Sequence, residues 1–261
     1  MINLDLRDHG WIWEGQGLDP GVYPSIFGVG EGAEYFGLRK VCYMFHPNDE
    51  LAMKKLSHLE EVVCDISKWR FKRTEGGTAN WADSSPDSVK SEARKVSALS
   101  TRYPNVKAAI HDDMKGLVEK EGFGPERYAE VYGALRSANP GLKLWSVVYS
   151  HELDGGYWRG FMPYIDVVNL WVWNARDLTG LDEYIERTRE IFARKPIVVG
   201  CYLRNYPERS PVPMDMLKHQ WNVVKSAIED GRILGFSILG TVLIDGHQEQ
   251  ANWIRDFIAR S

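Results

Sequence analysis

Short apolar runs alternate with amphipathic stretches along most of this chain. Seven runs rich in β-branched and aromatic residues follow residue 39, and a weaker run at residues 24–29 would supply one more strand, first in order. Strands that alternate with helices form βαβ units, and near-continuous apolar strands are typical of parallel sheets covered by helices. The seven runs are residues 41–45, 62–66, 106–112, 142–149, 167–173, 197–203 and 233–239.

The stretches between these runs carry helix start and stop signals. Ser85 followed by Pro86 predicts the beginning of a helix, and Pro125 predicts another. Gly231 follows an amphipathic stretch and predicts its left-handed end. The segment at residues 69–85, rich in Gly, Ser, Thr and Lys, is expected to be a loop over one end of the sheet.

Eight strands in this order can form either a closed barrel or an open doubly wound sheet. No G-x-G-x-x-G phosphate loop joins a strand to a helix, and polar residues end nearly every strand. These features favour a (β/α)8 TIM-type barrel, and the length of 261 residues suits a single catalytic domain over residues 1–261.

Charge and hydropathy exclude several classes of partner. The formal net charge is −4 with acids and bases interspersed, so no basic face is expected to bind nucleic acid. No uncharged apolar stretch is long enough to span a membrane, and the first residues lack the apolar run of a signal peptide, so we expect a cytoplasmic protein. A processed secreted form would look the same. The three cysteines lie in expected strands and are interpreted as core residues.

The candidate site follows from the barrel, because side chains just beyond the strand ends converge on one mouth. The run from Ala108 to Met114 ends a strand with His111, Asp112 and Asp113. Alternation predicts that Ile110 points outward and that His111 and Asp113 point inward, although a bulge would exchange the two aspartates. Adjacent carboxylates repel each other, a tension typical of catalytic acids, although one of them could instead cap the following turn.

Two further carboxylates end neighbouring strands. Asp65 is expected either to orient a substrate hydroxyl or neighbouring base, or to be a buried acid paired with Lys68 or Arg70. Glu152 follows the strand that ends at Tyr149, and it is the predicted second carboxylate for acid–base work or else an exposed loop charge.

Aromatic and amide side chains at other strand ends suit a sugar, whose apolar face stacks on rings while its hydroxyls bond polar groups. Arg204 could also restrain an aspartate of the site. The candidate contacts are Trp69, Trp173, Asn174, Tyr202 and Arg204, with His46, His111 and His151 as further substrate-binding candidates.

Histidines near the expected mouth, His247 among them, raise a metal-dependent alternative. No paired spacing such as H-x-H or H-E-x-x-H is present, so the sequence predicts neither a metal nor another cofactor.

The Ala-Ile-His-Asp-Asp-Met strand end, with tryptophans and acids on several other strands, resembles glycoside-hydrolase-type barrels from about Pro24 onward. The resemblance lies in the barrel architecture and in the kinds of residue at the strand ends. The Asp-x-x-Asp-x-Asp-x-Glu strand of one chitinase group is absent, and the seventh expected strand ends in Tyr202 and Arg204 instead of a glutamate.

The resemblance implies a glycosidase that acts on a saccharide or glycoside with paired carboxylates. Two alternatives remain open at this stage. One is a metal-dependent hydrolase, lyase or isomerase at the same mouth, and the other is a non-catalytic sugar-binding barrel. The sequence makes no prediction of the oligomeric state.

Overall fold

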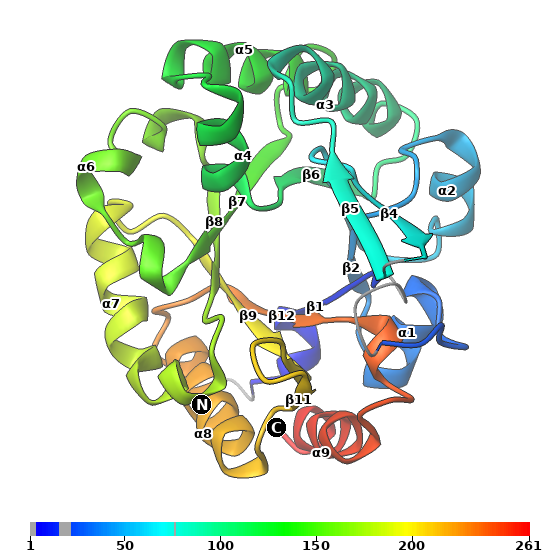
Figure 1. Ribbon diagram of the computed structural model, residues 1–261, viewed down its shortest axis with the longest axis vertical. Coiled ribbons are helices and arrows are strands. Elements are labelled where there is room, and N and C mark those ends of the chain that lie inside the picture. Colours follow the sequence, from blue (N-terminus) through cyan, green and yellow to red (C-terminus); the bar gives the residue numbers. More distant parts are fainter. Residues whose placement is uncertain (1–3, 16–21, 76) are drawn as a thin grey trace.

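The computed structural model describes residues 4–15, 22–75 and 77–261. Eight parallel strands form a closed ring, which Figure 1 shows end-on, in the order β1-β12-β9-β8-β7-β6-β3-β2. Because β12 pairs with β1, the sheet has no edge, so the barrel is confirmed and the open sheet is excluded. The strands are β1 (Gly10–Trp13), β2 (Lys40–Tyr43), β3 (Glu61–Asp65), β6 (Val106–His111), β7 (Lys143–Tyr149), β8 (Val167–Trp171), β9 (Ile197–Tyr202) and β12 (Gly235–Leu239).

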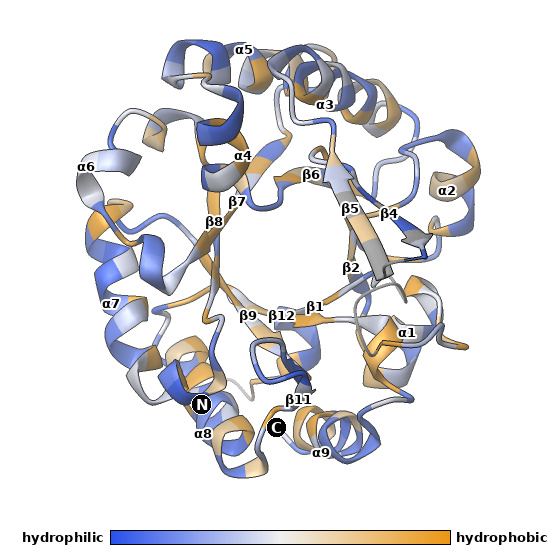
Figure 2. Ribbon diagram, in the orientation of Figure 1, coloured by the Kyte–Doolittle hydropathy of each residue, from blue (hydrophilic) through white to orange (hydrophobic). Residues whose placement is uncertain are grey.

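Helices surround this ring, and Figure 2 shows apolar strands inside a layer of helices whose polar residues lie mainly on the outside. The α-helices are α1 (Val29–Phe36), α2 (Glu50–Lys55), α3 (Pro86–Ser100), α4 (Met114–Glu121), α5 (Pro125–Leu135), α6 (Gly155–Trp158), α7 (Leu181–Ile191), α8 (Met214–Glu229) and α9 (Gln248–Ala259). Short 3-10 helices are η1 (Leu6–His9), η2 (Ser150–Glu152), η3 (Met162–Tyr164), η4 (Ala175–Gly180) and η5 (Thr241–Leu243). Two short strands, β10 (Arg204–Asn205) and β11 (Ser210–Pro211), form a separate ribbon.

The predicted helix signals are confirmed. The Ser85 hydroxyl caps α3 by accepting a hydrogen bond from the Ser88 N–H, and Pro125 occupies the first turn of α5. Gly231 follows α8 with a φ of +67°, the left-handed conformation that glycine adopts without strain.

The first strand is not where the sequence predicted it. Residues 24–29 form no strand, and Val29 begins α1, while Gly10–Trp13 supplies the first strand of the barrel. All four residues of β1 are buried, and a Cβ at Gly10 would lie 2.6 Å from side-chain atoms of Leu38 and Phe236. The run is short and follows a charged segment, so its apolar pattern is a weak signal for a strand.

The segment predicted as a loop over the barrel is an antiparallel hairpin. Its strands are β4 (Trp69–Thr74) and β5 (Gly77–Ala82), and Figure 1 shows the hairpin over the right side of the ring, between α3 and α1. Trp69 lies at its base, immediately after the turn that follows β3.

Among the described residues, no helix combines the length and the apolar character needed to cross a membrane. Cys42, Cys64 and Cys201 are buried free thiols, as expected of core residues.

Candidate active site

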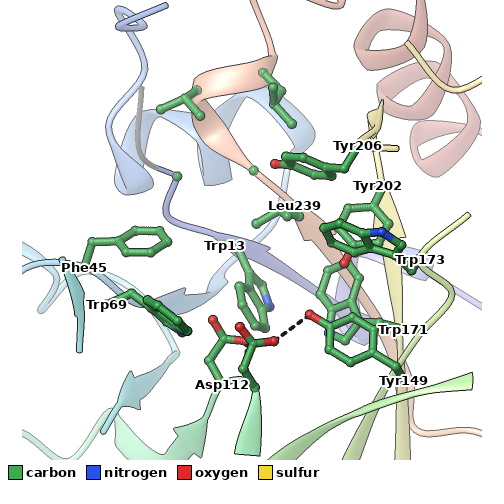
Figure 3. Close-up of a pocket in the computed structure, with 15 residues that line it drawn as sticks. Trp13, Phe45, Trp69, Asp112, Tyr149, Trp171, Trp173, Tyr202, Tyr206 and Leu239 are labelled. Carbon is green, nitrogen blue, oxygen red and sulfur yellow. Dashed lines mark hydrogen bonds between the residues drawn. The ribbon is translucent and has the colours of Figure 1, made fainter. Parts of the chain in front are cut away.

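A cavity of about 220 Å³, here called the inner pocket, opens among the carboxyl ends of the strands. Figure 3 shows Asp112 between Trp69 and Tyr149, with Trp13 above it in this view. Glycines and aliphatic side chains complete the lining, and none of the described lining residues is Lys, Arg or His. The acids and aromatic residues of the inner pocket are Asp112, Asp113, Trp13, Phe45, Trp69, Tyr149, Trp171, Trp173, Tyr202 and Tyr206.

Strand β6 leads into this pocket with side chains in the opposite phase to the predicted one. Ile110 pairs in register with Trp145 of β7, whose ring lies 5.2 Å from that of Trp11 on β1, centroid to centroid. Strands β1 and β7 are not neighbours in the ring, so this aromatic contact crosses the barrel interior. Ile110 therefore points inward, not outward.

His111 points to the helix layer, so its predicted inward orientation is wrong. Its ring stacks on Tyr128 of α5 with centroids 5.8 Å apart, and its Nδ1 lies 3.3 Å from the Tyr128 hydroxyl. The side chain is fully buried, and this burial lowers the pKa of His111 to about 3. Because register with neighbouring strands fixes the phase of a strand, alternation within one strand could not decide it.

Both aspartates nevertheless reach the inner pocket. Asp112 follows the inward phase of Ile110, and the chain then turns at Asp113, which has a φ of 47° and a ψ of 34°. This left-handed conformation is uncommon for residues other than glycine, but aspartate tolerates it better than most. The turn brings the second carboxyl to the same cavity, so consecutive residues do not point to opposite faces here.

The environment of these two acids favours a retained proton. Burial, followed by the neighbouring charges of Asp113 and Asp65, raises the pKa of Asp112 well above its usual value. Burial also raises the pKa of Asp113, while the Tyr149 hydroxyl opposes this by donating a hydrogen bond of 2.8 Å to Asp113 Oδ1. A carboxyl pair of this kind holds a proton at a pH where a solvated aspartate has lost it, as acid–base chemistry requires.

The aromatic wall is built from strands that are distant in sequence. The rings of Trp13 and Trp171 meet edge to face, with centroids 5.1 Å apart. The centroid distance is 4.6 Å between Trp171 and Tyr202, and it is 5.4 Å between Trp173 and Tyr206, whose rings are stacked. A Cβ at the β9 glycine, Gly200, would lie 2.0 Å from the Trp171 ring, so this position has to lack a side chain.

Two indole groups of the inner pocket offer hydrogen-bond donors. Within the described residues, neither Trp13 Nε1 nor Trp69 Nε1 has a partner, and both atoms are buried. A buried donor without a partner is costly, so an acceptor oxygen on a bound molecule would be favoured at either position.

Glu152 lies beside the inner pocket but lines a second cavity. This cavity of about 310 Å³, here called the outer groove, is lined by Trp69, Asp113, Gly116, Leu117, Lys120 and Glu152. Glu152 Oε2 accepts the Tyr149 N–H at 3.0 Å, and burial raises the pKa of Glu152. The structure thus brings Glu152 together with Asp113, as the sequence predicted, but in a separate compartment from Asp112.

Asp65 belongs to a turn and not to either cavity. Its Oδ1 accepts from the Ser67 N–H at 2.8 Å and the Ser67 hydroxyl at 2.6 Å, and its Oδ2 accepts from the Lys68 N–H at 2.8 Å. The Lys68 ammonium donates to the carbonyls of Met44 and His46, so it helps to hold the adjoining loop. Burial raises the pKa of Asp65, which is only 1% exposed. Of the two interpretations of Asp65, the buried acid agrees better with these contacts.

Among the other predicted contacts, Trp69, Trp173 and Tyr202 line the inner pocket, whereas the amide, the arginine and two histidines do not. Asn174 immediately precedes η4, and the buried Arg204 lines a small separate cavity together with Tyr202. The exposed His46 is hydrogen-bonded to Glu14, and the exposed His151 stacks on Tyr149.

These histidines do not come together. Within residues 4–15, 22–75 and 77–261, no three His, Cys, Asp or Glu side chains form a group that could hold a metal ion.

Sequence reasoning missed several residues of the site. The missed strand β1 carries Trp13, and Glu14 directly after it accepts the backbone N–H groups of Met44 and Phe45, holding the loop that supplies Phe45. The pattern Gly-Trp-Ile-Trp-Glu was the available signal for both. Other missed lining residues are Tyr149 and Tyr206.

No protein-family model and no curated protein sequence matches this chain. Solved structures do match it, and they include a β-D-glucuronidase from Dictyoglomus thermophilum at a TM-score of 0.62, 13% identity and 88% coverage of this chain. A family 18 chitinase from Crocus vernus matches at a TM-score of 0.55, 13% identity and 95% coverage, over 99% of its own chain. A family 2 β-galacturonidase from Eisenbergiella tayi, bound to galacturonate, matches at a TM-score of 0.61, 12% identity and 99% coverage.

The present chain spans 46% of the glucuronidase chain and 51% of the galacturonidase chain. At these identities the likeness is one of fold, and it confirms the resemblance to glycoside-hydrolase barrels inferred from the sequence.

Proposed function

We propose that this protein is a glycoside hydrolase that cleaves a glycosidic bond at the inner pocket with Asp112 and Asp113. The observation that carries this proposal is the placement of two consecutive carboxyl groups, both with a raised pKa, in an aromatic cavity at the barrel mouth. Catalytic residues of TIM barrels come from this end of the strands.

The proposed reaction needs one proton donor and one carboxylate. One carboxyl gives its proton to the glycosidic oxygen as the bond from that oxygen to the anomeric carbon breaks. The other, ionised, stabilises the positive charge on the anomeric carbon, either directly or by bonding to it, or activates water. Water then supplies a hydroxyl group to the anomeric carbon and a proton that restores the acid.

The walls of the inner pocket suit a sugar ring. Aromatic faces pack against the C–H groups of a pyranose, and the indole N–H groups of Trp13 and Trp69 can donate to its oxygens. The cavity is smaller than the roughly 300–1,000 Å³ of pockets for drug-sized ligands, which supports a site for one ring and not for a long glycan.

Charge supports a neutral or cationic ring. Two uronidases are among the structural neighbours, and the galacturonidase structure contains galacturonate. The described lining of the inner pocket contains two acids and no cation, and residues 16–21, which follow Gly15 in sequence, also contain no Lys, Arg or His. A uronate would therefore meet the negative charge of the ionised aspartate and no cation from this lining, which disfavours its binding.

The test is a panel of aryl glycosides and disaccharides that includes neutral sugars, amino sugars and uronates. Wild type should release sugar from a neutral or amino-sugar glycoside and should act weakly on glucuronides, and both Asp112→Asn and Asp113→Asn should lose disaccharide hydrolysis. Circular dichroism would establish that both variants are folded. Full activity in both variants would contradict the proposal.

A further inference from the structure

The inner pocket and the outer groove share two walls. Trp69 and Asp113 line both cavities, whereas Asp112 lines only the inner pocket and Glu152 only the outer groove. Asp113 therefore stands at the boundary between two compartments, and the two consecutive aspartates are not equivalent.

This difference has a chemical meaning for a glycosidase. The glycosidic oxygen links the sugar ring to its leaving group, and this oxygen must be protonated. The general acid therefore has to reach a point between the binding sites of the ring and the leaving group. Asp113 meets this requirement. A carboxylate that acts at the anomeric carbon needs to face only the first ring, which is the position of Asp112.

We propose that the outer groove binds the leaving group, that Asp113 is the general acid, and that Asp112 is the carboxylate acting at the anomeric carbon. This assignment rests on the proposed function and deepens it. The proton of the Asp113 carboxyl passes to the glycosidic oxygen, that oxygen takes the electron pair of the broken bond, and the leaving group departs along the outer groove as an alcohol.

The lining of the outer groove suits a polar leaving group with an apolar face. Trp69, Gly116 and Leu117 offer apolar surface, while Lys120 and Glu152 offer a donor and an acceptor. Tyr149 links the compartments, because its hydroxyl donates to Asp113 and its backbone N–H donates to Glu152. A second sugar fits this combination better than a purely apolar aglycone does.

Gly116 gives a way to block the outer groove alone. It is exposed on α4, and a Cβ built there has no atom within 4 Å, so Gly116→Phe begins its side chain in open space at the groove. Gly133→Phe is a matched control, because Gly133 is also exposed on a helix, α5, with nothing within 4 Å of its Cβ, and it lines neither cavity.

Two substrates that carry the same sugar but different leaving groups would distinguish the role of the outer groove from that of the inner pocket. A disaccharide needs both the groove and the acid, whereas the corresponding glycosyl fluoride has a small leaving group that departs without protonation. We expect Gly116→Phe to lower kcat/KM for the disaccharide at least about tenfold, a loss of about 1.4 kcal/mol of transition-state binding, and to leave the fluoride within about threefold of wild type. Gly133→Phe should match wild type on both.

The same two substrates should also distinguish the roles of Asp112 and Asp113. Asp113→Asn should lower kcat/KM for the disaccharide by about 10²–10⁴-fold, the usual contribution of a general acid, and should retain most fluoride hydrolysis. Asp112→Asn should lose both activities. Retained fluoride hydrolysis also reports that the Gly116 and Asp113 variants are folded.

The assignment is overturned if Gly116→Phe affects both substrates equally, or if Asp113→Asn loses the fluoride activity and Asp112→Asn keeps it. A wild-type protein that hydrolyses neither the fluoride nor any glycoside would instead contradict the proposed function itself. The two failures are thus distinguishable.

Discussion

Asp65 ends β3 and Asp112 directly follows β6, its neighbour in the barrel, yet the surroundings of the two acids differ. The oxygens of Asp65 accept three hydrogen bonds from Ser67 and Lys68, within the turn that Asp65 itself begins. In the described part of the chain, Asp112 has one such bond, from the Asp113 N–H at 3.0 Å, and its carboxyl lines the inner pocket. A strand-end acid is thus a better catalytic candidate when its own turn leaves its oxygens available.

The largest expected effect is on the activity of Asp112→Asn. We expect kcat/KM to fall by about 10²–10⁴-fold, because an amide cannot carry the negative charge that the anomeric carbon needs. Thermal unfolding should stay close to that of wild type, since the substitution relieves repulsion between two acids. Wild-type kinetics in Asp112→Asn would show that the Asp112 carboxyl is not needed for activity.

Asp65→Asn should have the reverse profile. The amide nitrogen replaces an oxygen that accepts a buried N–H, so we expect a loss of about 1–3 kcal/mol in the free energy of unfolding. Activity per folded molecule should change less than tenfold, measured beside urea denaturation curves. An inactive but stable Asp65→Asn would place Asp65 in the catalytic machinery.

His111 ends β6 and faces the helices, and it should make the free energy of unfolding depend on pH. Its folded pKa of about 3 lies below the ordinary 6.5, so the unfolded state binds more protons between these values. The neutral His111 ring therefore contributes fully to the free energy of unfolding above pH 6.5. This contribution is lost as the pH falls towards 3, by at most about 1.4 kcal/mol per pH unit.

His111→Phe keeps a ring against Tyr128 and removes this titration. Its free energy of unfolding should therefore fall less steeply than that of wild type between pH 6.5 and pH 4.5, as measured by urea denaturation at each pH. Parallel curves for the two proteins would contradict a buried neutral histidine.

The smallest expected effect is that of Tyr149→Phe on the pH dependence of catalysis. The Tyr149 hydroxyl lowers the pKa of Asp113 by donating to it, so its removal should raise that pKa. With Asp113 as the acid, the protonated form survives to higher pH, and the alkaline limb of kcat/KM should move upward. Tyr206→Phe is the matched control, because Tyr206 lines the same pocket and leaves the Tyr149–Asp113 bond intact. A shift to lower pH in Tyr149→Phe would contradict the assigned role.

The sequence predicted the fold better than it predicted the site. Apolar runs and helix caps such as Ser85 are local signals, and they were sufficient to predict a barrel. The first strand was missed because Gly10–Trp13 is only four residues long, and the hairpin because charged residues and two adjacent glycines interrupt its segment.

The site depended on information that is not local. Asp112 and Asp113 were predicted because two acids follow one strand, and both line the inner pocket. The orientation of His111 was wrong because the register with β7 sets the phase of β6. The turn conformation of Asp113 and the bonds that occupy Asp65 depend on backbone geometry that composition does not encode.

The most direct test compares kcat/KM of Asp112→Asn and Asp65→Asn on the glycoside that wild type cleaves fastest, with rates normalised to folded protein. The account predicts that the Asp65 variant exceeds the Asp112 variant by at least about tenfold, because the Asp112 variant loses at least about 100-fold and the Asp65 variant less than tenfold. Equal rates, or a more active Asp112 variant, would contradict it.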